Sequence, residues 1–498
     1  MTAFPMLSGT ENPSTYSKKN NADIRVLVVG GGLGGMACAA RLARAGLSVT
    51  LLERNSTLGG KVAEQRAAGF RWDIGPSLLT LPEALHDLGR YIGHPPPHLH
   101  RLESACRYVW PDGHTLDADA EFMQQPEVAS FLQHTEGIYA LSGEAFLKHP
   151  PTQFWRAFRP SNWPLLRHLP KLTTFKTLSQ DVRMRFQDPH LIQLFERYAT
   201  YNGSDPRHTP ATFNVIPYVE HAFGAWYPEG GIRALARWLE LALCALGVEV
   251  LSGETVREYD GSSLRTDSGK SWRPDIVICN GEVQRAYRDW IRLPGSASLS
   301  RKMDRPTRSL SGYVLLLGLD QKQEALAHHN IFFSENYHAE FDDLFIKKRF
   351  PSDPTLYLNV SCRTDPADAP AGGDNIFILA NAPAHPQSKA WSELTETYNN
   401  HILDKLEAMG MNAIRGHIVH MENLTPDALA ERDLSTHGAL YGAASHGLRA
   451  SLLRPPLRSP LDDKLFFVGG STHPGGGIPL VLYSAQMAAE AVLRSRGY

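Results

Sequence analysis

Cysteine is scarce in this sequence, and its spacing excludes two common uses. Five cysteines occur in 498 residues: Cys38, Cys106, Cys244, Cys279 and Cys362. They are odd in number and never closely spaced, so they match neither a structural zinc site nor a disulfide framework. We expect buried or incidental thiols in a reducing compartment, which predicts a cytoplasmic location.

An excess of either charge is also missing. Fifty Lys and Arg stand against 52 Asp and Glu, which gives a net charge of -2. Without a global field to gather a polyanion, no nucleic-acid partner is expected.

Long hydrophobic runs are missing as well. Residues 26–40 and 465–489 hold no Asp, Glu, Lys or Arg, but clustered glycines interrupt both, so they are poor membrane spans. Residues 1–23 lack the apolar run of a signal peptide and are expected to form a disordered tail.

A nucleotide-binding pattern begins directly after this tail. Residues 24–30, IRVLVVG, predict a buried strand, and a helical pattern follows it. Gly30 would permit a tight turn, Gly32 would let the backbone approach a pyrophosphate, and Gly35 would allow close helix packing. A second strand ends at Glu53, whose carboxylate would accept the ribose hydroxyls. The sequence therefore predicts a dinucleotide cofactor.

The next residues decide which dinucleotide is expected. ERNSTLGGK (53–61) and GFRWDIGPS (69–77) resemble the flavin-containing amine oxidase and phytoene desaturase superfamily. The resemblance implies FAD, held also by Arg54, Gly59, Gly60 and Lys61. The superfamily usually has Arg where this chain has Lys61, and Lys lacks the planar fork of Arg.

The C-terminal motif VGGSTHPGGGIP (468–479) resembles bacterial-type carotenoid desaturases. The resemblance implies that the loop contacts FAD, and the implied cofactor residues are Gly469, Gly470, Gly477 and Ile478. In the same loop, His473 and Thr472 are the candidate catalytic residues. Segment 195–233 and the residues around His328 and His329 also resemble this family.

On fold, the resemblance implies an α/β protein with a Rossmann-like, doubly wound FAD-binding domain that is discontinuous in sequence. We assign it residues 24–90, 225–300 and 440–498, with the backbone of Val256 offered to the adenine. An inserted α+β domain for substrate binding and membrane association would comprise residues 91–224 and 301–439.

On function, the resemblance implies an FAD-dependent desaturase of a linear carotenoid. A phytoene desaturase and a hydroxycarotenoid 3,4-desaturase both remain open, and so does the electron acceptor, a quinone or oxygen. The alternatives are a related carotenoid isomerase or saturase, and a non-enzymatic prenyl-lipid-binding protein of the same fold.

Two further features complete the expectations. Segment 150–176 mixes Trp and Phe with five Lys and Arg and no acid, which predicts docking at an anionic membrane surface. His328 and His329 are adjacent, so in a strand they would point to opposite faces and not share a metal. No metal site is expected.

Overall fold

The computed structural model describes residues 23–143, 176–384, 388–447 and 454–496. The expected disordered tail therefore lies outside the described residues except for Asp23, and the expected membrane-docking segment lies outside them except for Lys176.

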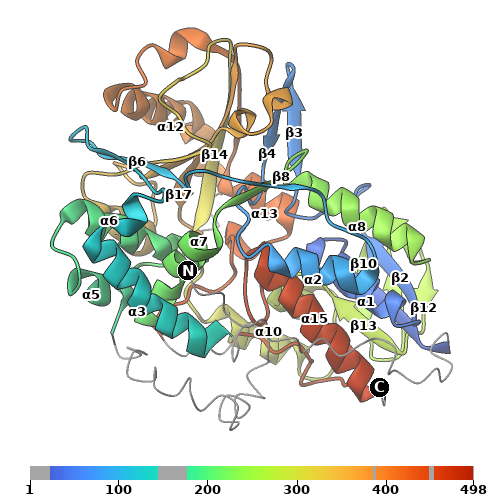
Figure 1. Ribbon diagram of the computed structural model, residues 1–498. Helices are drawn as coiled ribbons and strands as arrows, with labels where there is room; N and C mark the ends of the chain where they lie inside the picture. Colours follow the sequence, from blue (N-terminus) through green and yellow to red (C-terminus); the bar gives the residue numbers. More distant parts are fainter. Residues whose placement is uncertain (1–22, 144–175, 385–387, 448–453, 497–498) are drawn as a thin grey trace.

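A five-stranded parallel sheet in the order β19-β13-β1-β2-β9 forms one half of the molecule (Figure 1). Its strands come from three distant parts of the chain: β1 (Arg25–Val29), β2 (Ser48–Glu53), β9 (Glu249–Ser252), β13 (Ile276–Cys279) and β19 (Leu465–Phe467). The strand expected at residues 24–30 is β1, and the second expected strand is β2.

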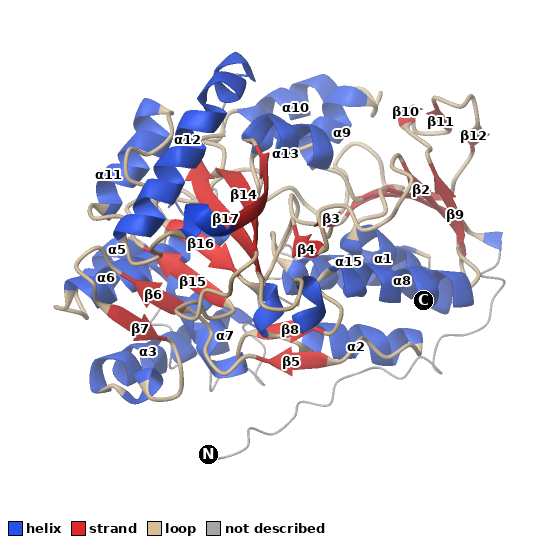
Figure 2. Cartoon of the chain, turned by 90° about the horizontal axis from the view of Figure 1, so that it is seen from above, coloured by secondary structure: helices blue, strands red, loops and turns tan. Residues whose placement is uncertain are grey.

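The two faces of this sheet follow from the alternation of side chains along a strand. Val26 and Val28 pack against a layer of helices, whereas Leu27 packs against Tyr259 and Tyr287 on the other side. Figure 2 shows the helices on one face and short strands on the other. The helices are α1 (Leu33–Arg44), α8 (Arg233–Ala245) and α15 (Ile478–Ser495), with α2 (Glu83–Ile92) packed beside them.

The second face departs from the doubly wound arrangement expected. An antiparallel sheet covers it together with the short helix α9 (Val283–Asp289), where a full second helical layer was expected. The strands of that sheet are β10 (Val256–Tyr259), β11 (Leu264–Thr266) and β12 (Ser271–Trp272). The segment after β9 has no apolar pattern long enough for a crossover helix. It turns back on itself at Gly261 and Gly269, both with positive φ.

A seven-stranded sheet in the order β18-β14-β17-β16-β15-β6-β7 forms the other half. Neighbouring strands are antiparallel except β15 and β6. The strands are β6 (Arg107–Val109), β7 (Thr115–Asp117), β14 (Ser311–Leu319), β15 (His329–Phe332), β16 (Leu356–Asn359), β17 (Asp374–Ala382) and β18 (Ile418–Leu424). All of them lie within 91–224 and 301–439, but the proposed domain boundaries themselves stay a prediction.

Side chains of strand β14 alternate between the two faces of the seven-stranded sheet. Leu315 and Leu317 pack against α12 (Ser388–Ala408), while Val314 and Leu316 face the opposite way and pack with Phe70. Phe70 belongs to β4 (Phe70–Asp73), which pairs with β3 (Glu64–Ala67). The sheet is therefore buried on both faces, which explains why β14 reads as a continuous apolar run.

The remaining α-helices and strands lie outside the two large sheets. They are α3 (Pro126–Ser142), α5 (Leu178–Arg183), α6 (Pro189–Glu196), α7 (Val215–Phe223), α10 (Ser296–Asp304), α11 (Tyr337–Phe341), α13 (Pro426–Asp433), β5 (Leu99–Arg101) and β8 (Trp226–Pro228). Strands β5 and β8 pair with each other although more than a hundred residues separate them in sequence.

A buried ionic network centred on Arg71 joins the halves. The Arg71 guanidinium donates to both carboxylate oxygens of Asp368 at 2.5 and 2.6 Å, to Asp73 at 3.0 Å and to the Tyr227 hydroxyl at 2.7 Å. Tyr227 in turn donates to Asp73 at 2.6 Å. Burial disfavours the charged guanidinium, but the hydrogen bonds to Asp368 and the charge of Asp73 outweigh it and raise the pKa of Arg71.

Arg71→Met is expected to lower the free energy of unfolding by about 3–5 kcal/mol, because two buried carboxylates lose their cation. Thermal unfolding of the FAD-loaded protein measures the effect. The matched control is Arg66→Met on β3, whose exposed side chain pairs with Glu64 and should change stability by less than about 0.5 kcal/mol. Equal melting temperatures for the two variants would contradict a structural role for the network.

Candidate active site

The first glycine turn is as tight as its sequence predicts. Gly30 has φ +100, and a Cβ on Gly35 would lie 2.1 Å from the Gly30 carbonyl oxygen. Only glycine at position 35 lets α1 begin this close to the end of β1.

The start of α1 presents unsatisfied backbone donors. Gly32 is its N-cap, no side chain caps it, and no acidic residue occurs in its first turn. The start of α15 also has an uncapped N-cap, Gly477 at φ +109, although Pro479 in its first turn has no N–H to donate. Such helix starts bind anionic or polar oxygens. The donor set therefore fits a cofactor that carries a pyrophosphate and a polar ring.

Glu53 ends β2 beside this turn. Its carboxylate accepts hydrogen bonds from the backbone N–H of Gly31 at 2.7 Å and of Asn55 at 2.8 Å. Both bonds fix the orientation of the carboxylate while its remaining lone pairs face the cavity that Glu53 lines. This geometry suits acceptance of two hydroxyl groups.

The second glycine pair packs directly against the first turn. The Gly59 N–H donates to the Gly31 carbonyl at 2.8 Å, and a Cβ on Gly60 would lie 3.1 Å from the Cα of Gly32. The two glycine segments therefore build one continuous backbone wall.

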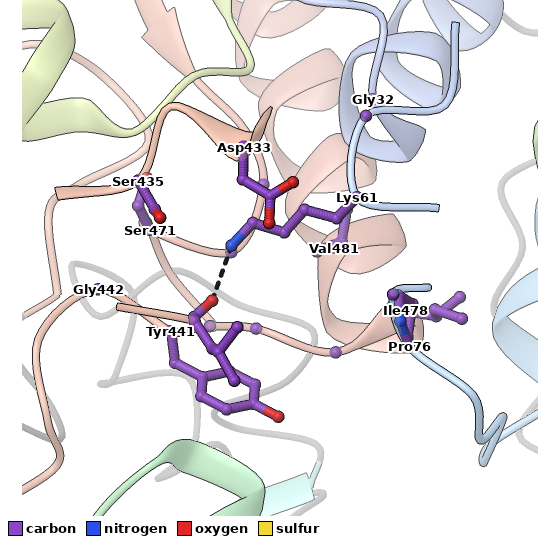
Figure 3. A pocket seen from close by; sticks show the side chains of 18 of the residues that line it. Gly32, Lys61, Pro76, Asp433, Ser435, Tyr441, Gly442, Ser471, Ile478 and Val481 are labelled. Atoms are coloured by element: carbon purple, nitrogen blue, oxygen red, sulfur yellow. Dashed lines mark hydrogen bonds between the residues drawn. The ribbon is translucent and has the colours of Figure 1, made fainter. Parts of the chain in front are cut away.

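Lys61 reaches from this wall into the cavity, where its amine donates to the Leu440 carbonyl at 2.8 Å (Figure 3). Desolvation lowers the pKa of Lys61, while the charges of Asp433 and Glu282 act in the opposite direction. Arg54 was expected to help hold FAD, but its guanidinium donates to the carbonyls of Glu431 and Arg432 at the end of α13.

These elements surround a single cavity of about 1070 Å³. Twelve of the thirteen predicted cofactor residues line it: Gly30, Gly32, Glu53, Arg54, Gly59, Gly60, Lys61, Val256, Gly469, Gly470, Gly477 and Ile478. Gly35 is the exception, because it packs inside the turn. The cavity continues past the glycine loops into an apolar region that includes Leu310, Val314, Ile331, Phe377 and Leu379.

The two candidate catalytic residues do not line this cavity. Thr472 is buried and donates its hydroxyl to the Pro455 carbonyl at 2.6 Å. His473 is also buried, and its backbone N–H donates to the same carbonyl. Their positions indicate that they shape the glycine-rich loop, and a catalytic role for either residue stays a prediction.

The expectation that His328 and His329 point to opposite faces is wrong. Their rings lie 4.5 Å apart, edge to face, because His328 precedes β15 and turns toward Tyr227. His328 bonds to the Thr364 hydroxyl at 2.6 Å, and His329 to the Tyr357 hydroxyl at 2.8 Å. Burial lowers the pKa of His328 to about 3. Within the described ranges, no group of three or more His, Cys, Asp or Glu is placed to hold a metal ion.

Two further cavity residues lie outside the motifs that the sequence analysis used. Arg454 lies beside Gly475 and donates to the Gly470 carbonyl at 3.1 Å, and burial lowers its pKa to about 10. Asn280 packs against Gly30 and donates to its carbonyl at 3.3 Å. The sequence hint for Asn280 was its place directly after β13, since ligands bind beyond the carboxyl ends of parallel strands.

A model of the family described as "Flavin containing amine oxidoreductase" matches residues 33–493. The chain belongs to this family. The match spans the acid at the end of β2, the second glycine pair and the glycine-rich start of α15.

Two curated proteins show more specific similarity. The chain is 34% identical to the "4,4'-diapolycopene oxygenase" of Methylomonas sp., over 95% of this chain and 99% of that protein. It is 33% identical to the "1-hydroxycarotenoid 3,4-desaturase" of Flavobacterium sp., over 94% and 99%. The resemblance to the bacterial carotenoid desaturase type is thereby confirmed.

The fold is also found in solved structures. The cyclohexylamine oxidase of Brevibacterium oxydans matches with a TM-score of 0.60 at 16% identity, over 95% of this chain and 100% of that one. The protein is an FAD-dependent oxidoreductase, and the predicted cofactor FAD is confirmed. The non-enzymatic alternative is set aside.

Glu53→Ala is expected to lower FAD affinity by about 10- to 100-fold, because each charge-assisted hydrogen bond contributes about 1.5–3 kcal/mol. The measurements are the flavin-to-protein ratio after purification and titration of FAD into the apoprotein. Glu249→Ala is the matched control, since that carboxylate accepts from Thr50 on the neighbouring strand and does not line the cavity. An unchanged flavin content in Glu53→Ala would remove Glu53 from the cofactor site.

Proposed function

We propose that this enzyme desaturates a linear carotenoid. The observation that carries the proposal is the continuity of the cavity, which runs from the glycine-rich turns into a wall of apolar side chains. A volume of about 1070 Å³ is at the upper end of the range of about 300–1,000 Å³ that is usual for ligand pockets. The names of the two curated relatives, one an oxygenase and one a desaturase of carotenoids, support the same substrate class.

The polar and the apolar residues that line the cavity have different roles in the proposal. The uncapped starts of α1 and α15, with Glu53 and Lys61, would hold FAD, which when bound supplies a two-electron acceptor. Leu310, Val314 and Phe377 would bind the polyene and exclude water from the reacting carbons. Desaturation removes a hydride from one carbon and a proton from its neighbour, and the two electrons of the second C–H bond form the new double bond.

This chemistry places few demands on side chains. The conjugated chain itself stabilises the positive charge that develops on the carbon, so a weak base or water suffices to take the proton. The absence of Thr472 and His473 from the cavity wall is compatible with such a reaction. The electrons then pass to a quinone or to oxygen.

An oxygenation is the second candidate, because one curated relative is named an oxygenase at nearly the same identity as the desaturase. The two reactions differ in product: oxygenation adds oxygen to the substrate, whereas desaturation only lengthens the conjugated system.

We further propose that the enzyme binds a membrane surface peripherally. Transfer of a long hydrocarbon through water is unfavourable by about 0.8 kcal/mol for each CH₂ group, so direct uptake from a bilayer is favoured. Among the described helices, none has both the length and the apolar composition needed to cross a membrane. Segment 150–176 remains our candidate docking surface.

Expression in one host that accumulates phytoene and in another that accumulates a hydroxylated acyclic carotenoid tests the desaturase proposal. We expect a red-shifted carotenoid absorption in at least one host, because each added double bond lengthens the conjugated system. Glu53→Ala expressed in parallel is the control and should give less product in proportion to its lost FAD. Flavin-loaded wild type that changes neither pigment would contradict the proposal, and a product that has gained oxygen would identify the oxygenase instead.

A further inference from the structure

Three polar side chains on the cavity wall have buried polar atoms that bond to no described residue. They are Arg197 through Nε, Asn202 through both Nδ2 and Oδ1, and Tyr337 through its hydroxyl. The residues are only 6%, 7% and 5% exposed. A buried polar atom without a partner destabilises a folded protein, so these atoms point to a ligand that bonds to them.

Arg197 and Asn202 are the two ends of one 3-10 helix, η8 (Arg197–Asn202). Arg197 lies over the rings of Tyr108, Tyr198 and Tyr201, at 5.4, 4.8 and 5.2 Å from their centres. Its Nη2 donates to the Tyr108 hydroxyl at 3.1 Å. A guanidinium so enclosed by aromatic rings has lost its water and keeps donor capacity toward the cavity.

The charge around Arg197 is already balanced. Glu220 is fully buried nearby, where it accepts hydrogen bonds from Tyr198 at 2.7 Å and from Tyr201. Burial disfavours the charged guanidinium, but the surrounding tyrosines and, after them, Glu220 keep the pKa of Arg197 well above its ordinary value. A second carboxylate on the ligand would add an uncompensated buried charge, so a neutral oxygen group is the better complement.

Asn202 distinguishes between neutral oxygen groups. Its amide offers a donor and an acceptor, and both are unpartnered. A hydroxyl can satisfy both because it donates and accepts, whereas a carbonyl only accepts and would leave Oδ1 bare. The residue is held in place by Gly203, whose N–H donates to Thr200 and whose carbonyl accepts from Leu310, both at 2.9 Å.

We propose that Arg197 and Asn202, with Tyr337 on the same cavity wall, form a polar subsite that binds a hydroxyl group of the substrate. The substrate class is then a hydroxylated linear polyene, and a pure hydrocarbon leaves the subsite unsatisfied. This inference rests on the proposed function, because it assumes that the apolar part of the cavity receives a polyene.

The test compares two ligands on the FAD-loaded enzyme: an acyclic carotenoid with one terminal hydroxyl group, and the parent hydrocarbon with the same conjugated chain. Both are presented in the same detergent, and binding is followed by the change in flavin absorbance. We expect wild type to bind the hydroxylated ligand at least tenfold more tightly. Asn202→Leu, which has a similar volume, should lower that affinity about tenfold and leave hydrocarbon binding unchanged.

Two further variants sharpen the result. Tyr337→Phe removes only one hydroxyl from a buried ring and should give a smaller loss, about threefold to tenfold, for the hydroxylated ligand alone. Thr200→Val is the matched control on η8, since the Thr200 hydroxyl already donates to the Arg197 carbonyl at 2.8 Å, and it should leave the preference unchanged.

Equal wild-type affinity for the two ligands, or an equal loss for both in Asn202→Leu and Tyr337→Phe, would overturn the polar subsite while the desaturase proposal stands. Failure of the wild type to bind either polyene would overturn the proposed function and the subsite together. A lower flavin content in Asn202→Leu would overturn the subsite by assigning the amide to FAD.

Discussion

The buried Arg71 guanidinium is the interaction on which the arrangement of the two halves depends. Its partners come from β4, from β8 and from the loop before β17, so one cation holds three segments that are far apart in sequence. The cavity lies between the halves that this network joins. Any shift of β4 against β8 would move the segment 74–81, part of which lines the cavity, relative to the apolar wall. A buried charge network resists such a shift because partial separation leaves desolvated carboxylates unpaired.

The cofactor half of the site could be predicted from the sequence because its determinants are local. Turns at Gly30 and Gly59 depend on backbone conformations and close approaches that only glycine allows, and such residues are visible in any sequence. Glu53 is equally visible because it ends a strand at a fixed distance from the turn. The structure brings all three to one cavity.

The other residues of the site come together only through long-range packing, so no local sequence motif predicted them. Arg454 meets the glycine loop only through the folded chain, and Arg197 is recognisable as a buried cation only once three tyrosine rings surround it. At His473 a motif drew attention to a residue that does not line the cavity, and its catalytic role stays a prediction. The layer of β10 to β12 was missed for a related reason, since the second face of a parallel sheet can be covered by strands as well as helices.

Because FAD binds in the cavity between the two halves, its binding also stabilises the folded protein. Bound FAD contributes packing contacts to the lining of the cavity of about 1070 Å³ between the two halves. Ligand that binds only the native state stabilises it by about 2.7 kcal/mol at a hundred times its dissociation constant. The amount of this enzyme that survives proteolysis in a cell should therefore follow the supply of flavin, so vitamin limitation would remove the protein as well as its activity.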